Sequence, residues 1–180
     1  MRQQGRLLSR KMSGNRQRGV VLFVVLVIML LLTIIGVTAM NNVTMEERMA
    51  GNLRDSDLAF QAAEATLRNG ENWLLPQITP PGTCATGPCT TVWQESTLLD
   101  LAGQDDAWWN TQGRVGDGDI SGLYADPRFV LEELAWVRDS LVVGHAVTTG
   151  SDYYKVTARA VGGSQSAISI LQTTFIKRYN

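Results

Sequence analysis

The peptide bond between Gly19 and Val20 is the place in this sequence best suited to a processing reaction. On one side lies a leader with six cations and no acids (Arg2, Arg6, Arg10, Lys11, Arg16 and Arg18), and on the other a run from Val20 to Met40 without charge. A cut directly after the glycine would remove residues 1–19 and leave the whole apolar run on the mature chain. That run is long enough to cross a bilayer as a helix, which takes about 20 residues at roughly 1.5 Å each.

Two other interpretations of this segment stay open. The chain could keep its leader and use the apolar run as a permanent single-span anchor. It could instead carry a secretory signal that is cleaved after the small residues Val37-Thr38-Ala39. The secretory signal fits less well, because the apolar core of such signals has about 7–15 residues and this one is longer.

The basic residues also set the expected orientation. Lys and Arg are held on the cytoplasmic side, so we expect the leader inside and everything after Met40 outside. Of the 16 basic residues six lie in the leader, which leaves ten against 17 acidic residues and a net charge of −7 for the rest. Nucleic-acid binding depends on clustered cations, so this acidic exported part argues against a nucleic-acid partner.

The two cysteines, Cys84 and Cys89, are separated by four residues. In an oxidising compartment this spacing predicts a local disulfide that closes a turn. Because the closed loop is short, its stabilising effect should stay below the roughly 3 kcal/mol expected for a loop of fifteen residues. The spacing excludes a thioredoxin-like pair, and a single histidine in the chain provides no zinc set.

A weaker candidate for metal chemistry is the acidic turn around Asp117. Asp117, Asp119 and Ser121 occupy positions one, three and five of a calcium loop, with a glycine at position six. Position twelve, where such a loop needs a bidentate glutamate, is Arg128. A positive side chain there disfavours a cation, so we expect a plain acidic turn without metal.

The sequence offers no set of nucleophile, base and orienting residue. The single histidine, His145, lies in an apolar, strand-like segment, which is typical of a structural histidine. We therefore expect neither catalysis nor a cofactor. The adjacent Trp108 and Trp109 cannot both face inward on a strand, so one of them is a candidate for a partner surface.

A long amino-terminal helix must position these residues. After Met40 the chain turns polar but has no proline until Pro76, which predicts one helix from Val20 to about Leu75. Residues 20–41 would span the membrane, and residues 42–75 would be amphipathic, with one apolar stripe (Met45, Met49, Leu53, Phe60, Ala63, Leu67 and Leu74). Gly36, Gly51 and Gly70 weaken this helix by about 1 kcal/mol each against alanine. A break near Asn41-Asn42 is the alternative.

The rest of the chain, from Pro76 to Asn180, is expected to form one modest domain. Residues 76–127 are rich in Gly, Pro and Asp, which predicts loop with short helical pieces. Residues 128–180 predict an antiparallel sheet, with candidate strands at 128–137, 140–147, 154–160 and 166–177 and a turn at Gly162-Gly163. Lys155, Thr157 and Arg159 would share one face. A long helix laid on such a sheet is an α+β architecture.

Two segments carry a resemblance to a known family. Glu46-Glu47-Arg48-Met49-Ala50-Gly51-Asn52, followed by Ala59-Phe60-Gln61-Ala62-Ala63-Glu64, resembles the amino-terminal signature of PilX, a minor pilin family of type IV pilus assembly. The resemblance covers roughly Gln17 to Arg68 and returns weakly at 154–159 and 171–175, while the middle third shows none. It implies a pilin-like fold and a structural role in assembly.

The resemblance also implies roles for particular residues. A prepilin peptidase would cut between Gly19 and Val20, and the new amino terminus at Val20 would be N-methylated. Most major pilins carry a glutamate at the fifth mature position, which pairs with a neighbouring subunit's amino terminus in the apolar filament core; here that position is Val24. A lone carboxylate in the apolar core is costly, and pairing with the amino terminus recovers part of that cost. Val24 has no carboxylate and cannot form this pair. This favours a place as first subunit at the tip, with a shaft subunit that tolerates the loss as the alternative.

The expected partners follow from the same resemblance. They are the other minor pilins and the major pilin, contacted through the helix, the prepilin peptidase, the inner-membrane assembly platform and a large pilus-tip adhesin. We expect the protein in the inner membrane with its carboxy-terminal domain in the periplasm, in a small complex that initiates filament growth, and later at the pilus tip. Alternatives are a membrane-anchored periplasmic binding or sensor protein, and a minor pseudopilin of a type II secretion system.

Overall fold

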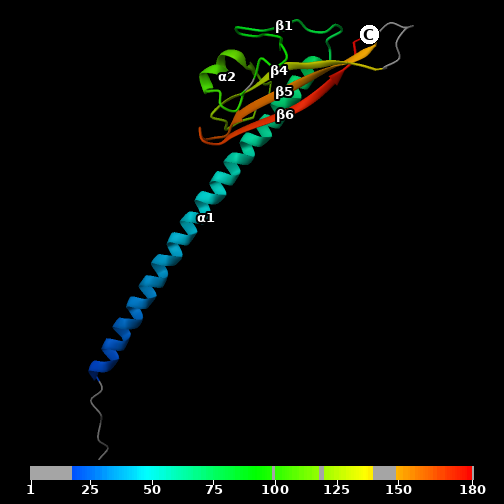
Figure 1. The fold of residues 1–180 in the computed structure, drawn as a ribbon. Coiled ribbons are helices and arrows are strands. Elements are labelled where there is room, and N and C mark those ends of the chain that lie inside the picture. The colour runs from blue at the N-terminus through cyan, green and yellow to red at the C-terminus, as the bar shows by residue number, and fades with distance from the viewer. Residues whose placement is uncertain (1–17, 99, 118–119, 140–148, 180) are drawn as a thin grey trace, which may run out of the picture. The chain divides into compact units, whose positions relative to one another are not determined.

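A computed structural model describes residues 18–98, 100–117, 120–139 and 149–179. Its elements in chain order are α1 (Arg18–Leu74), β1 (Thr83–Cys84), β2 (Val92–Trp93), α2 (Asp106–Gln112), β3 (Arg114–Val115), β4 (Ala125–Arg138), β5 (Gly150–Val161) and β6 (Ile168–Lys177) (Figure 1). By their contacts the residues form two units, 1–48 and 49–180, and α1 contributes to both. The fold is α+β, as the sequence predicts, with a long helix and, in the second unit, a sheet against which its last turns pack.

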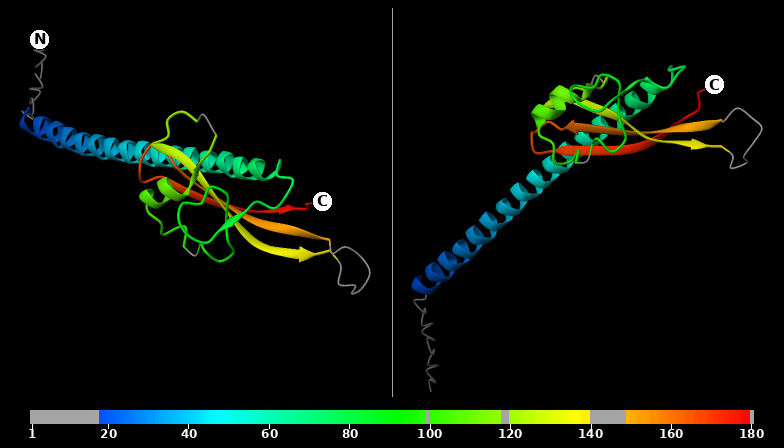
Figure 2. Two further views of the ribbon diagram at one scale, coloured as in Figure 1. Left: turned by 90° about the horizontal axis from the view of Figure 1, so that it is seen from above. Right: turned by 45° about the horizontal axis from the view of Figure 1, so that its top comes forward.

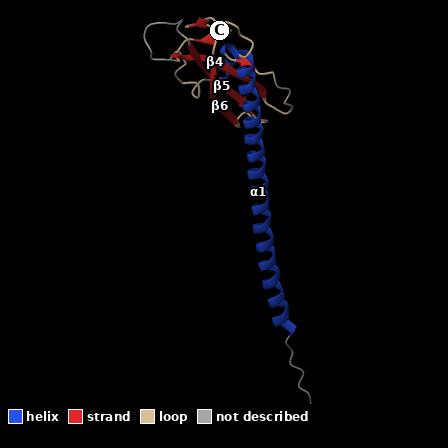
Figure 3. Cartoon of the chain, turned by 90° about the vertical axis from the view of Figure 1, so that its right-hand side faces the viewer, coloured by secondary structure: helices blue, strands red, loops and turns tan. Residues whose placement is uncertain are grey.

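α1 is one helix of 57 residues (Figure 3). It continues through Asn41 and Asn42, so the alternative of a break at these residues is wrong. It ends one residue before the predicted boundary, at Leu74. The last carbonyl groups of a helix have no partner within it, and here Lys177 Nζ of β6 donates hydrogen bonds of 2.6 Å to the carbonyls of both Leu74 and Leu75.

The sheet has the strand order β1-β2-β4-β5-β6, and β3 also pairs with β4. The three long strands β4, β5 and β6 are antiparallel, with Val130 opposite Thr157 and Thr157 opposite Gln172. The pairs β1–β2 and β2–β4 are parallel, so the sheet is mixed at this edge and not antiparallel throughout. Strands of two residues are too short to show alternation, which is why the sequence predicts only loop there. The candidate strand at 140–147, with His145, lies outside the described residues.

The last turns of α1 pack on one face of the sheet mainly through small side chains. The most buried positions expose 1% or less of their surface (Ala59, Ala62, Ala63, Thr66 and Leu74). At Gly70 the helix lies directly against the sheet, since an added Cβ would lie 2.4 Å from Val156 Cγ1 and 3.1 Å from Phe129 Cδ2. The glycine that weakens the helix by propensity is therefore the residue that lets it approach the sheet.

The opposite face of the sheet is covered by residues 84–98 and 100–112, which we call the cover and which include β2 and the last residue of β1 at the sheet edge. Its apolar centre consists of Cys89, Trp93, Leu101 and Trp109, packed around Val130 of β4. Figure 2 shows α2 and its flanking loops on one side of the sheet and the last turns of α1 on the other. The second unit thus has three layers, formed by helix, sheet and cover.

Candidate functional site

The candidate processing site lies in the first turn of α1. α1 begins at Arg18, so Gly19 and Val20 are both helical. A Cβ added at Gly19 would meet no atom within 4 Å, and Val20 is 66% exposed. A side chain at position 19 can therefore change without disturbing the described fold. Residues 1–17 lie outside the part of the chain that the structure describes.

Val20–Met40 present an uninterrupted exposed apolar surface. The two hydroxyl groups in this run bond to the helix's own backbone, with Thr33 Oγ1 donating to the Leu30 carbonyl at 2.7 Å and Thr38 Oγ1 to the Ile34 carbonyl at 2.8 Å. These hydroxyl groups have their hydrogen-bond partners within the helix and need no water. The segment therefore meets the condition set by a bilayer or an apolar helix bundle, where no water is present. In the described part of the chain, α1 is the one helix long and apolar enough to cross a membrane, judged by length and composition.

Val24, the fifth residue counted from Val20, lies within this apolar surface and is 47% exposed. The first acidic residues after Val20 are Glu46 and Glu47. They lie about 30 Å farther along the helix than Val24, at a rise of roughly 1.5 Å per residue. No carboxylate of this helix can therefore replace a glutamate at position 24.

The apolar stripe predicted for the second half of α1 divides into two parts. Ala63, Leu67 and Leu74 pack against the sheet, whereas Met49, Leu53 and Phe60 are 65%, 66% and 46% exposed. Small side chains on this face of the helix allow the close approach at Gly70, while Leu67 and Leu74 pack into the apolar cluster that contains Phe129 and Val156. The exposed members, with Met45, form a second uncovered apolar surface.

The disulfide predicted between Cys84 and Cys89 is formed. It does more than close a turn, because Cys89 is only 5% exposed and belongs to the apolar centre of the cover. Next to it, Thr91 Oγ1 donates a hydrogen bond of 2.6 Å to the Gly82 carbonyl. The disulfide therefore holds the first part of the cover beside the sheet.

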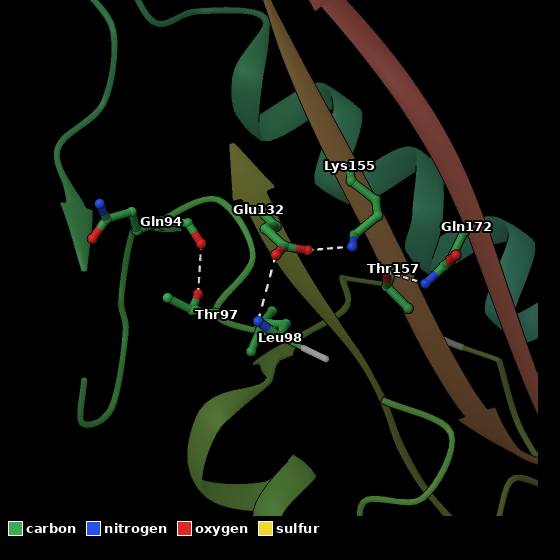
Figure 4. A network of polar contacts seen from close by, with 7 residues as sticks. All are labelled: Gln94, Thr97, Leu98, Glu132, Lys155, Thr157 and Gln172. Atoms are coloured by element: carbon green, nitrogen blue, oxygen red, sulfur yellow. Dashed lines mark hydrogen bonds and ion pairs between the residues drawn. The ribbon is translucent and has the colours of Figure 1, made fainter. Parts of the chain in front are cut away.

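An ion pair is buried where the cover meets the sheet (Figure 4). Glu132 of β4 is 2% exposed and pairs with Lys155 of β5. Its other carboxylate oxygen lies 3.4 Å from the backbone N–H of Leu98 in the cover, which donates to it. A buried carboxylate is tolerated only when it is paired and hydrogen-bonded, so this contact fixes how the cover lies on the sheet.

The same polar layer continues along β5. Thr157 is 1% exposed and its hydroxyl accepts a hydrogen bond of 3.1 Å from Gln172 Nε2 of β6. Arg159 is buried and pairs with Asp106 in the first turn of α2. Lys155, Thr157 and Arg159 share one face, as the alternation predicts. The cover lies over that face, so it is not open to solvent. Alternation in the sequence shows which residues share a face but not whether the face is covered.

Asp55 connects α1 to the turn between β5 and β6, a contact for which the sequence carries no local signal. Its carboxylate accepts hydrogen bonds from the backbone N–H groups of Gly163 and Ser164 and from the Ser164 hydroxyl. These bonds, above all that from the hydroxyl, lower the pKa of Asp55. Gly162 leaves room for the contact, because an added Cβ would lie 2.5 Å from the backbone oxygen of Asp55.

The tryptophans do not all lie in the core. Trp108 and Trp109 stand on α2, with ring centroids 5.3 Å apart in an edge-to-face arrangement, and Trp109 is 1% exposed while Trp108 is partly buried. Trp136 of β4 is the most exposed tryptophan, at 47%, and lies against Gly150. Its strand position gave no signal of this exposure, because an aromatic residue in a strand is typical of a core.

Two tyrosines meet edge to face in the apolar cluster that contains Leu74, with ring centroids 6.5 Å apart. Tyr154 and Tyr179 are joined by a hydrogen bond of 3.1 Å between their hydroxyl groups. Burial raises the pKa of both phenols, and it also raises the pKa of Asp152 beside them. A phenol with a raised pKa stays protonated at neutral pH, so this pair is suited to packing and not to proton transfer.

The plain acidic turn without metal, expected around Asp117, stays a prediction. Asp117 and Ser121 are exposed, but Asp119 lies outside the described residues. Among the residues that are described, no group of three or more His, Cys, Asp and Glu side chains could hold a metal ion.

Residues 18–68 match the family model described as PilX N-terminal, and residues 61–177 match the model described as type IV pilus assembly protein PilX C-term. The second match extends through the middle of the chain, where the sequence analysis found no resemblance. Neither the curated proteins nor the solved structures gave a match.

Proposed function

The chain belongs to the PilX family of type IV pilus assembly proteins, and we propose that as a minor pilin it joins other minor pilins in a complex that initiates the filament and then occupies its tip. The observation that carries this proposal is Val24, which lies in an exposed apolar helix with no carboxylate before Glu46. A subunit that cannot offer the fifth-position carboxylate fits best where no pairing with a preceding subunit is needed. The first position in a filament meets that condition.

Maturation is the first step of the proposed mechanism. A prepilin peptidase cuts between Gly19 and Val20 on the cytoplasmic side, and Val20 is then N-methylated. The retained segment contains fifteen Val, Ile, Leu or Phe residues between Val20 and Met40. At about 0.3–0.6 kcal/mol each, they favour the bilayer by on the order of 5–9 kcal/mol.

Assembly is the second step, and it follows from this free energy. The helix can leave the bilayer only for surroundings that are equally apolar, and the helices of other minor pilins and of the major pilin provide them. Packing among such helices gains little from hydrophobicity and depends on the shape of the contact. The inner-membrane assembly platform would extract the complex, and a large tip adhesin is the partner expected beyond it.

The maturation step is tested by mass spectrometry of the amino terminus. We expect the wild-type chain from pili to begin at a methylated Val20. Gly19→Val should block processing without unfolding, because the position is open. Gly36→Val is the matched control, since Gly36 is also open and lies in the same helix, and it should be processed normally. Assembled pili that retain Met1 would contradict the proposal.

The tip position is tested by adding the carboxylate back. Val24→Glu should let the subunit enter the shaft, so immunogold labels that sit at pilus ends in wild type should spread along the filament. Val25→Glu is the control, because Val25 is 48% exposed but lies about 100° around the helix from Val24, which leaves its carboxylate unpaired. Val24→Glu labels that stay at the ends, or a deletion strain with normal pilus number, would count against tip initiation.

A further inference from the structure

β6 forms an edge of the sheet and lacks the features that usually protect an edge strand. Its ten residues pair with β5 without a register shift, and in the described part of the chain no strand lies on its other side. From Ile168 to Ile176 it has no charge, no proline and no glycine. Exposed edges are normally blunted by such residues, by bulges or by shortness. The opposite edge, β1, is only two residues long.

The main-chain groups along β6 point alternately toward β5 and toward the open edge. Gly162 N–H donates to the Ala167 carbonyl at 2.7 Å, so Ala167 faces its partner and Ile168 does not. Because the pairing continues without a shift, the outward residues are Ile168, Ile170, Gln172, Thr174 and Ile176. This edge therefore offers five N–H and five C=O groups to an added strand.

A groove adjoins the same residues. It has a volume of about 430 Å³ and is lined by Asp100, Leu101 and Ala102 of the cover and by Ile170 and Gln172 of β6. Asp100 is exposed and held in place by the Gly103 N–H, which donates to its carboxylate at 3.0 Å. The ion pairs found within the described residues leave this carboxylate without a cation.

We propose that β6 accepts an extended segment of another protein as an additional strand, with a Lys or Arg side chain of that segment in the groove beside Asp100. In strand addition, main-chain hydrogen bonds give affinity and a pocket for an alternate side chain gives specificity. The edge itself is uncharged, so the one carboxylate of the groove sets the charge of the occupant. A second copy pairing through its own Ile168–Ile176 would bring no cation to Asp100, which is why we assign the site to a different protein. This proposal is independent of filament initiation, because an edge strand can accept a partner strand whether the subunit lies at the tip or in the shaft.

Photo-cross-linking in the full-length protein in pilus-producing cells tests the proposal. A benzoylphenylalanine replaces Ile176, an outward residue that is 55% exposed. The matched control replaces Val115 of β3, which is 53% exposed and is separated from β6 by β4 and β5. We expect a product at Ile176 and none of that mass at Val115. Mass spectrometry should place the cross-link in an extended segment of another protein that contains a basic residue.

Two variants separate strand addition from simple proximity. Thr174→Pro removes an outward N–H and should lower the cross-link yield about tenfold, since each 1.4 kcal/mol is a factor of ten. If this variant does not fold, Thr174→Lys charges the same edge and should have the same effect. Asp100→Asn should lower the yield only about two- to fivefold, as expected for an exposed ion pair. An unchanged yield in a folded Thr174 variant, a product with a second copy of this chain, or no product at all would overturn the proposal.

Discussion

Residues 20–40 and residues 59–74 belong to one helix but carry different kinds of side chain. The first stretch consists mainly of Val, Ile and Leu and is exposed throughout, while the second buries Ala59, Ala62, Ala63 and Thr66 almost completely. Both stretches are helical, so they differ in the surface against which each one packs. For the second stretch it is the sheet of the same chain. For the first it is supplied by other molecules, first lipid and then sister helices in the proposed mechanism.

The same substitution in the two stretches gives the sharpest test of this contrast. Leu74 is fully buried and Leu30 is 58% exposed. Leu74→Ala should destabilise the second unit by about 2–5 kcal/mol through the cavity it leaves, and Leu30→Ala should leave its unfolding unchanged. Thermal unfolding of the full chain in detergent, followed by tryptophan fluorescence, reports on this unit because all five tryptophans lie in it. Equal melting temperatures for the two variants would show that α1 does not pack as described.

Glycine replacements should change stability in opposite directions along α1. Gly70→Ala places a methyl group against Val156 and should cost about 1–3 kcal/mol by overpacking. Gly51→Ala meets no atom within 4 Å and should stabilise the helix by up to about 1 kcal/mol. The same melting experiment measures both, and a stabilised Gly70→Ala would refute the close approach at that position.

Lys177→Met should destabilise the second unit by about 1.5–3 kcal/mol, because charge-assisted hydrogen bonds to the end of α1 are lost. Arg178→Met is the control. It removes a more exposed ion pair with Asp139, and such pairs are worth about 0–1 kcal/mol. Urea unfolding curves of the two variants should differ in midpoint; coincident midpoints would mean that Lys177 does not cap the helix.

The smallest effect is expected at Asp55 and depends on pH. Its pKa is lowered in the folded chain, so its contribution is present above the pKa of the unfolded state and is lost as the pH falls through the folded pKa. Asp55→Asn should be less stable than wild type at neutral pH, and the difference should shrink in acid. Asp57→Asn removes the same charge from a residue whose hydrogen bond, accepted from Gln61, is confined to α1, and it should keep the acid dependence of the wild type. A constant difference between Asp55→Asn and wild type across pH would contradict a role for the Asp55 carboxylate in holding the β5–β6 turn.

The sequence predicts the long helix, the disulfide and the three long strands because each has a local signal. Val20–Met40 is uncharged, Cys84 and Cys89 are the only cysteines, and Tyr154–Ala160 alternates. The parts it misses depend on contacts between distant segments. The pairing of Lys155 depends on Glu132 in another strand, the requirement for glycine at position 70 depends on Val156, and the role of Asp55 depends on a turn 108 residues away. The cover has strands of two residues, which carry no periodic signal at all.

The two fastenings of α1 have a mechanical consequence. Asp55 holds one end of the packed stretch to the β5–β6 turn, and Lys177 holds the other end near the finish of β6. They lie about 30 Å apart along the helix, at a rise of roughly 1.5 Å per residue. A force along the helix axis would act on both attachments and on the buried face between them at the same time, as a shear load. The contacts would then have to break together and not one after another. A subunit fastened in this way is suited to a fibre that bears tension.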